Sequence, residues 1–146
     1  MEYKRMTAEH VAQIAELEKQ CFSSPWSEKS IFGELNNPLS LWIVAVENNR
    51  VVGYVGSQSV LGEADMMNVA VAPEYRRQGV ANALIIELIS QLASRDVHSL
   101  TLEVRASNIP AITLYEKMDF AQVGRRPNYY SAPKEDALIL RKEWIL

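Results

Sequence analysis

The chain has 146 residues, of which 48% are hydrophobic and 23% are charged, and its formal net charge is −3. These values are typical of a globular protein that buries a proper core, and they predict one domain, residues 1–146, without disordered or low-complexity segments. The negative net charge argues against direct nucleic-acid binding, because such domains usually carry a basic surface.

Several other classes are excluded by short patterns. No run of about 18 apolar residues predicts a membrane span, and no opening apolar stretch predicts a signal peptide, so we expect no membrane partner and a cytoplasmic location. The one cysteine, Cys21, excludes an internal disulfide. Histidine and cysteine form no cluster with metal-ligand spacing, so no metal is expected. Both histidines, His10 and His98, are predicted to lie on the surface.

The beginning of the chain predicts a short strand followed by two helices. The strand spans residues 3–6, and residues 7–21 carry apolar side chains at helical spacing. A proline breaks this helix, and a serine caps a second helix that ends before residue 36. Phe22 and Trp26 lie at the bend between the helices. They either plug the core or form the wall of an acceptor site.

The middle of the chain predicts a meander, a crossover helix and another strand. The meander consists of three β-rich runs at residues 41–47, 51–60 and 65–71, the first two joined by a hairpin at residues 48–50. A helical pattern follows from Val80 to about residue 95. The strand predicted at residues 99–104 comes after this helix, so it should pair in parallel with residues 65–71.

A carboxylate lies in the strand at residues 99–104. One face of this strand carries Leu100, Leu102 and Val104, and the other carries Thr101, Glu103 and Arg105. A charge in the middle of a strand enclosed by helices is unusual. Either the sheet is open to solvent on this face, or Glu103 is a positioned carboxylate that faces a cleft.

A short helix and two strands complete the predicted order. The helix spans residues 108–118, with an asparagine at its cap and a proline in its first turn, where the missing N–H is tolerated. Tyr115 lies near its apolar face and is either a packed tyrosine or a functional one. Strands are predicted at residues 120–124 and 137–142, with a polar, aromatic loop over residues 125–131.

The segment between the meander and the long helix carries the clearest functional pattern. Arg76 and Arg77 precede Gly79, and the helix begins directly afterwards. The unpaired N–H groups and the dipole at a helix start favour an anion, and a glycine allows close approach of the main chain. The spacing is neither a Walker loop nor a Rossmann fingerprint. By itself the segment is either a solvated turn or a phosphate-binding loop.

This loop resembles the coenzyme A pyrophosphate loop, Arg/Gln-x-x-Gly-x-Gly/Ala, of the GCN5-related N-acetyltransferases. The resemblance covers the whole chain, because Asn108-x-x-Ala111-x-x-x-Tyr115 follows at the expected distance. Four segments resemble, more narrowly, the RimI family of ribosomal-protein alanine N-acetyltransferases: residues 25–27, 102–108, 128–130 and 135–137. Asp119 departs from the pattern, which has glycine there; because aspartate tolerates a left-handed cap better than most residues, we expect local strain and no loss of function.

The resemblance implies an α/β fold with a mixed, mostly antiparallel sheet, splayed fourth and fifth strands, about four flanking helices, and acetyl-CoA as co-substrate in the gap. The acetyl and pantetheine end would be held by Val69, Ala70 and Val71. The pyrophosphate would be held by Arg76, Arg77, Gln78, Gly79, Val80, Ala81 and Asn82. Asn108 and Ala111 would lie along the pantetheine arm.

The resemblance also implies roles in catalysis. Glu103 would be the general base, Tyr115 the general acid for the departing thiolate, and a main-chain N–H near Val69 would meet the acetyl oxygen. Arg105 is expected to favour the ionised form of Glu103. The acceptor walls would be Phe22, Trp26, Asn128, Tyr129 and Tyr130.

An α-amine is the acceptor that suits this chemistry best. Its pKa of about 7.7–8 leaves much more neutral nucleophile at pH 7 than a lysine with a pKa near 10.4. The family implies the N-terminal alanine of the eighteenth protein of the small ribosomal subunit, and a monomer or weak dimer. Two alternatives stay open: another amine, such as a lysine side chain, a polyamine or an antibiotic, and a CoA-binding regulatory subunit without turnover.

Overall fold

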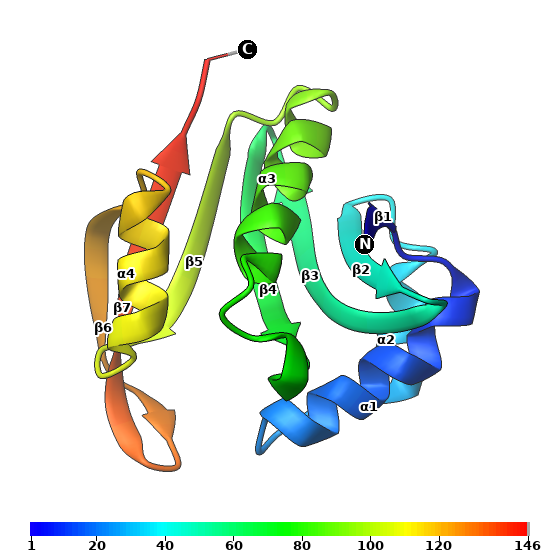
Figure 1. Ribbon diagram of the computed structural model, residues 1–146. Helices are drawn as coiled ribbons and strands as arrows, with labels where there is room; N and C mark the ends of the chain where they lie inside the picture. Colours follow the sequence, from blue (N-terminus) through cyan, green and yellow to red (C-terminus); the bar gives the residue numbers. More distant parts are fainter. Residues whose placement is uncertain (146) are drawn as a thin grey trace.

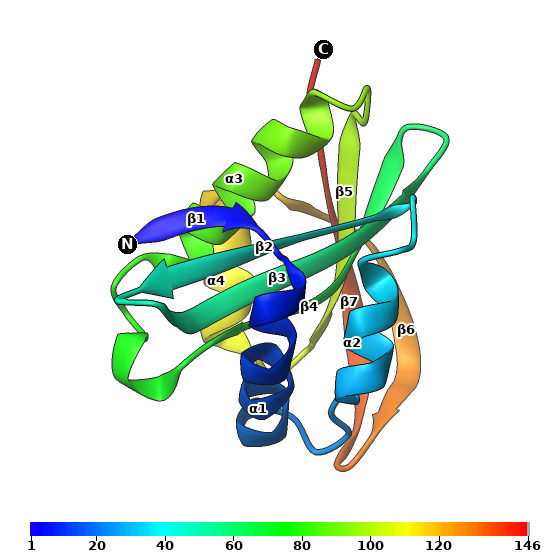
Figure 2. The same ribbon diagram turned by 90° about the vertical axis from the view of Figure 1, so that its right-hand side faces the viewer.

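The computed structural model describes residues 1–145, which form one seven-stranded sheet with helices on both faces (Figures 1 and 2). The strands are β1 (Glu2–Arg5), β2 (Ser40–Glu47), β3 (Arg50–Val60), β4 (Glu63–Val71), β5 (Ser99–Arg105), β6 (Ala121–Ser131) and β7 (Lys134–Glu143). The α-helices are α1 (Val11–Cys21), α2 (Glu28–Glu34), α3 (Val80–Ala93) and α4 (Ile109–Lys117), and short 3-10 turns lie at Ala8–His10 and Pro73–Tyr75. The order in the sheet is β1-β2-β3-β4-β5-β7-β6. The predicted α/β class and order of elements are confirmed.

The two faces of the sheet carry separate cores. Alternate residues of β2 show the division, because Ile43 packs in the core that contains α3, whereas Trp42 and Val44 pack in the core that contains α1. This alternation follows from the two-residue period of a strand. Helices α1 and α2 therefore cover one face, and α3 and α4 cover the other.

Strands β4 and β5 are parallel but pair only briefly. Residues 63–65 of β4 pair with residues 99–101 of β5, whereas β5 pairs with β7 along its entire length. Beyond Asp65 and Thr101 the two strands separate, and Figure 1 shows them diverging below this point. Both the parallel pairing and the implied splay are confirmed. The splay creates an opening in the middle of the sheet.

Two expectations about local structure are wrong. Residues 125–131 are not a loop but the second half of β6, which is an edge strand. Most of β6 is exposed, so its sequence shows no apolar alternation, and an edge strand tolerates Pro127 because its N–H is not needed for pairing. His10 is also not on the surface: it is only 4% exposed. Its Nδ1 accepts a hydrogen bond from the Thr7 N–H at 2.9 Å, and this bond holds the ring against the turn that begins at Thr7.

Other local expectations are confirmed. Asn48 and Asn49 both have positive φ, 50° and 64°, as a tight hairpin turn requires. Asp119 has a φ of 68°, which is the left-handed conformation that an aspartate tolerates better than most residues. Within residues 1–145, no helix is long and apolar enough to cross a membrane.

Candidate active site

The opening between β4 and β5 exposes main-chain groups of β4. The Ala72 N–H donates to the Val52 carbonyl of β3 at 2.8 Å, so the main chains of residues 72 and 70 face β3. The main-chain groups of Val69 and Val71 face the other way because successive residues alternate. They point into the gap beyond the short paired region. Two of the three residues predicted to hold the acetyl and pantetheine end therefore present main-chain groups there, whereas Ala70 does not.

The loop before α3 has the backbone of an anion-binding turn. Arg77 and Gly79 have φ values of 63° and 78°, so the chain turns twice through the left-handed region. The first helical bond of α3 runs from the Ala83 N–H to the Gly79 carbonyl at 3.0 Å. The N–H groups of residues 80–82 precede that bond and point out of the helix start. A Cβ placed on Gly79 would meet no atom within 4 Å, so the turn is open.

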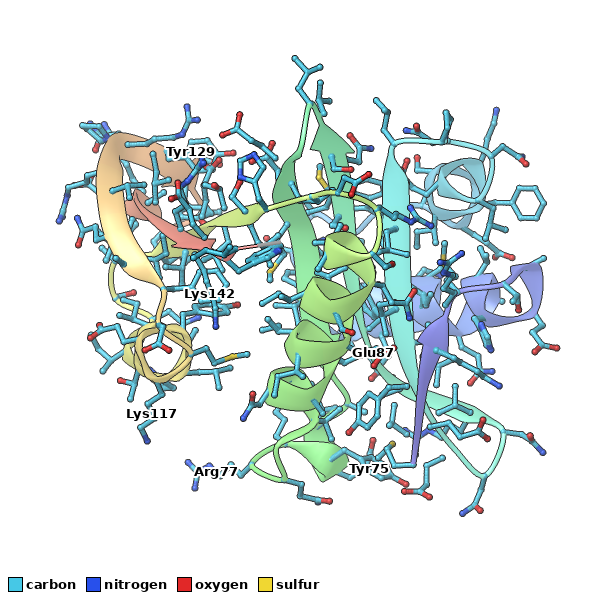
Figure 3. All side chains as sticks on the ribbon, turned by 90° about the horizontal axis from the view of Figure 1, so that it is seen from above. Tyr75, Arg77, Glu87, Lys117, Tyr129 and Lys142 are labelled. Atoms are coloured by element: carbon cyan, nitrogen blue, oxygen red, sulfur yellow. The ribbon has the colours of Figure 1, made fainter. Side chains whose placement is uncertain are left out.

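The side chains of this loop divide between structure and solvent. Arg76 Nε donates to the Val71 carbonyl at 3.1 Å, so this arginine ties the loop to the end of β4. Gln78 Nε2 donates to the Glu74 carbonyl at 3.1 Å. Arg77 is exposed, and Figure 3 shows it projecting from the start of α3. Both arginines are exposed, and Arg76 differs from Arg77 in that its side chain is bonded to the end of β4.

The start of α4 lies on the β5 side of the gap. Asn108 caps this helix, because its Oδ1 accepts a hydrogen bond from the Ala111 N–H at 3.3 Å. The cap leaves the Asn108 amide nitrogen available as a donor. Ala111 is half-buried, with a methyl side chain that leaves the helix start unobstructed. Both residues are compatible with a long, flexible ligand lying along the gap.

Glu103 projects from β5 on the face opposite its apolar residues. Its side chain is 30% exposed, and its Oε2 lies 3.5 Å from the Nε of Arg126. The pKa of Tyr129 is raised, first by a hydrogen bond to Glu103. Burial raises the pKa of Asp65, and the charge of Glu103 raises it further, so the two carboxylates lie close together. Glu103 therefore lies at an exposed position of β5 beside a cation, a tyrosine and a second carboxylate.

Tyr115 is a buried residue of α4. Its ring is 5% exposed and packs edge to face against Phe120, with 5.6 Å between the ring centroids. Burial raises the pKa of Tyr115 to about 12, and the nearby Tyr130 contributes to the increase. The hydroxyl is therefore protonated at neutral pH and is available as a hydrogen-bond donor.

The predicted acceptor walls come from both sides of the gap. The main-chain N–H of Trp26 donates to Glu18 Oε1 at 2.8 Å. The Trp26 ring packs edge to face on Trp42, with 5.5 Å between the ring centroids. Phe22 is half-buried against the same core. Across the gap, Tyr129 and Tyr130 of β6 pack edge to face at 5.1 Å.

Asn128 shapes the backbone of β6 just before the two tyrosines. It has a φ of 54°, and its N–H donates to Asp136 at 2.8 Å. Figure 3 shows Tyr129 and Arg77 on opposite sides of the sheet. The gap thus lies between the side that carries the open start of α3 and an aromatic, acidic side with Glu103, Tyr129 and Tyr130, and Tyr115 of α4 lies near Tyr130.

Sequence reasoning missed three residues of this region. Arg126 was expected in a loop, yet it pairs with Glu103. Asp65 lies beside Glu103 only because β4 and β5 are parallel there. Glu18 is fully buried in α1, and its carboxylate accepts hydrogen bonds from Tyr54, Asn68 and the Trp26 N–H. The sequence did contain a signal for Glu18, because it is an acidic residue on the apolar face of a helix. A carboxylate that is buried there must accept hydrogen bonds.

The chain thus combines a parallel strand pair that opens after three residues with a left-handed turn at the start of the following helix, and this is the arrangement that the family resemblance implies. The model of the Acetyltransferase (GNAT) family matches residues 11–120, and the chain belongs to that family. The predicted resemblance is confirmed.

Relatives of the chain are named as N-acetyltransferases. The [ribosomal protein bS18]-alanine N-acetyltransferase of Escherichia coli (strain K12) is 40% identical over 126 residues, which cover 85% of this chain and 84% of the relative. The protein of the same name from Haemophilus influenzae is 39% identical over 134 residues, which cover 88% of each chain.

Solved structures show the same fold. The crystal structure of the ribosomal-protein-S18-alanine N-acetyltransferase from Escherichia coli has a TM-score of 0.91 and 34% identity, and it covers 99% of this chain and 94% of its own. Arabidopsis thaliana NAA60 in complex with acetyl-CoA has a TM-score of 0.87 at 19% identity, with 97% of both chains covered.

Proposed function

We propose that the protein transfers an acetyl group from acetyl-CoA to the N-terminal α-amine of a protein, and that the acceptor is the N-terminal alanine of ribosomal protein bS18. One observation carries the proposal: the gap between β4 and β5 lies between the open start of α3 and Tyr130, which is near both Glu103 and Tyr115. The names of relatives that are 39–40% identical support the choice of acceptor.

The residues present fit acetyl-CoA. The N–H groups of residues 80–82 and the exposed Arg77 suit its pyrophosphate, because they combine free donors with full positive charge. The main-chain groups of Val69 and Val71 along the gap suit the amide groups of a pantetheine arm. Asn108, at the opposite side of the gap, adds an amide donor.

The chain's own residues then supply proton transfer and charge stabilisation. Acetyl-CoA brings an activated thioester. Glu103 removes the proton from the attacking α-amine, directly or through a water molecule. The Val69 N–H stabilises the developing negative charge on the acetyl oxygen, because it is a fixed donor at the open edge of a strand. Tyr115 donates its hydroxyl proton to the departing sulfur, which a pKa of about 12 permits at neutral pH.

Release of free thiol from acetyl-CoA tests the proposal. The acceptors are a short peptide with the alanine terminus of ribosomal protein bS18, the same peptide blocked at its N-terminus, and a blocked peptide with an internal lysine. We expect turnover on the free terminus alone, with the acetyl group located on the α-amine by mass spectrometry. Turnover on the lysine peptide, or on polyamines alone, would reassign the acceptor. Binding of CoA without turnover on any amine would indicate a regulatory subunit.

A further inference from the structure

Arg105 ties the end of β5 to the tip of the hairpin formed by β6 and β7. Its Nη1 donates to the Pro133 carbonyl at 2.9 Å and lies 3.3 Å from Glu135 Oε1, and its Nη2 donates to the Ala132 carbonyl at 3.3 Å. The guanidinium carbon also lies 4.3 Å from the centroid of the Tyr130 ring. One planar cation thus contacts the turn of the hairpin and an aromatic ring of its strand simultaneously.

A second bond completes this connection. Glu135 Oε2 accepts a hydrogen bond from the Ser107 N–H at 2.6 Å, so Glu135 contacts both Arg105 and the turn that follows β5. Arg105 is therefore directed away from Glu103, whose cationic partner is Arg126. The side chain that was expected to act on the carboxylate acts on the hairpin.

The hairpin needs such a connection because its own ladder is interrupted. The register between β6 and β7 shifts between Arg126 and Tyr130, and Asn128 within this stretch has a left-handed backbone. Regular pairing resumes only at Tyr130, opposite Glu135, so Tyr129 is unpaired and the hairpin tip is separated from the rest of the ladder by the interruption. The contact with Arg105 connects the hairpin tip directly to β5, whose pairing with β7 is uninterrupted.

We propose that Arg105 is a positioning residue for the acceptor substrate: by stacking on Tyr130 and holding the hairpin tip, it fixes the aromatic wall beside Glu103 and Tyr115. This inference rests on the proposed function, because the wall is the acceptor side of the gap. A lysine cannot replace it, since an ammonium group is a compact charge that does not stack and does not present two parallel donors. Among the described residues, the loop of Arg77 and the β4 main-chain groups, which the proposed function assigns to acetyl-CoA, form no hydrogen bond with Arg105, whose side-chain bonds go to residues 132–135.

The kinetic test compares Arg105→Lys and Arg105→Met with the wild-type enzyme, measuring KM separately for the alanine-terminal peptide and for acetyl-CoA. We expect kcat/KM for the peptide to fall roughly 10- to 100-fold. KM for acetyl-CoA should stay within about twofold of the wild-type value. Arg141→Lys is the matched control: Arg141 has a similarly buried side chain and two ion pairs, but with Glu63 and Glu143.

A double variant tests whether Arg105 acts through the ring. In a Tyr130→Leu background, adding Arg105→Lys should change the peptide kcat/KM much less than it does in the wild type. Hydrogen exchange of residues 127–133, read by mass spectrometry, should accelerate in both Arg105 variants and not in Arg141→Lys. This readout needs no turnover.

The outcomes separate the inference from the function on which it rests. An active wild-type enzyme whose Arg105 variants keep the peptide KM and kcat overturns the inference alone. Equal losses for peptide and acetyl-CoA, or an equal loss in Arg141→Lys, also overturn it, because they indicate a general effect on the fold. A wild-type enzyme that acetylates no peptide terminus overturns the proposed function first.

Discussion

Arg126 of the edge strand β6 forms an ion pair with Glu103 of β5, with 3.5 Å between Nε and Oε2. The two strands are not neighbours, because β7 lies between them, so the arginine reaches across a whole strand. The pairing places a cation, a carboxylate and the Tyr129 hydroxyl at the acceptor side of the gap. On the proposed function, Glu103 is the proton acceptor that amine acetylation requires, and Arg126 is the counter-charge beside it.

Glu103→Gln should abolish general-base catalysis while preserving the fold. The amide has the same shape but cannot take up a proton, so kcat should fall roughly 100-fold or more, while KM for acetyl-CoA stays unchanged. The acid limb of the kcat/KM profile should disappear with it. Glu143→Gln is the control, since Glu143 is an exposed partner of Arg141. An unaltered pH profile in Glu103→Gln would remove Glu103 from the mechanism.

Tyr115→Phe should lower kcat roughly 100-fold, with little change in either KM, because the ring packing on Phe120 is kept and only the hydroxyl is lost. The pKa of Tyr115 is raised to about 12, so the donor form persists well above neutral pH. Deprotonation of Tyr115 should therefore cause no alkaline loss of wild-type activity below about pH 11. Kinetics from about pH 6 to 11 check this. Undiminished turnover in Tyr115→Phe would refute the assignment.

Gly79→Ala should weaken acetyl-CoA binding and destabilise the fold by about 1 kcal/mol, because a φ of 78° strains any residue with a Cβ. Space is not the cause, since no atom lies within 4 Å of the added methyl group. Gly33→Ala is the matched control: its Cβ also meets nothing, but it lies within α2 and should stabilise by roughly 0.5–1 kcal/mol. Equal effects of the two substitutions on unfolding by urea would contradict the argument.

His10 should make the free energy of unfolding depend on pH. Burial lowers its pKa below the ordinary 6.5, and its Nδ1 is already an acceptor for the Thr7 N–H. Below about pH 6.5 the unfolded chain binds a proton that the folded chain does not, so stability should fall as pH decreases. Above that pH the contribution is constant.

Urea unfolding between about pH 5 and 7.5 measures this dependence. His10→Asn keeps an acceptor oxygen near the same place but does not titrate, so its stability should vary less over this range. His98→Asn, at an exposed position, should retain the wild-type slope. If His10→Asn retains that slope as well, the dependence comes from other groups.

The sequence predicts the secondary structure and the strand pairing best where the apolar residues follow a regular period and the connection between strands obeys a general rule. The order of strands, the parallel pair after the crossover helix and the apolar face of β5 follow from periodicity and from the rules for strand connections. The anion loop is recognisable because Gly79 and two arginines lie directly before a helix. The roles of Glu103 and Tyr115 came from the family resemblance, since spacing alone left each of them open.

The remainder depends on contacts between distant segments. The edge strand β6 is exposed and irregular, so its residues carry no alternating pattern, and Arg126 was placed in a loop. The direction of a side chain with several possible partners is also not encoded locally, and Arg105 turns to the hairpin instead of to Glu103. His10 is buried by a bond to its own turn, which composition does not reveal.

The brief pairing of β4 with β5 should affect how long the protein survives in a cell. On the proposed function, the pantetheine arm occupies the place where the two halves of the sheet lack hydrogen bonds to each other. A bound ligand at 100 times its dissociation constant adds about 2.7 kcal/mol to the free energy of unfolding. Resistance to intracellular proteases should therefore rise and fall with the supply of acetyl-CoA. The enzyme would persist longest when its own co-substrate is abundant.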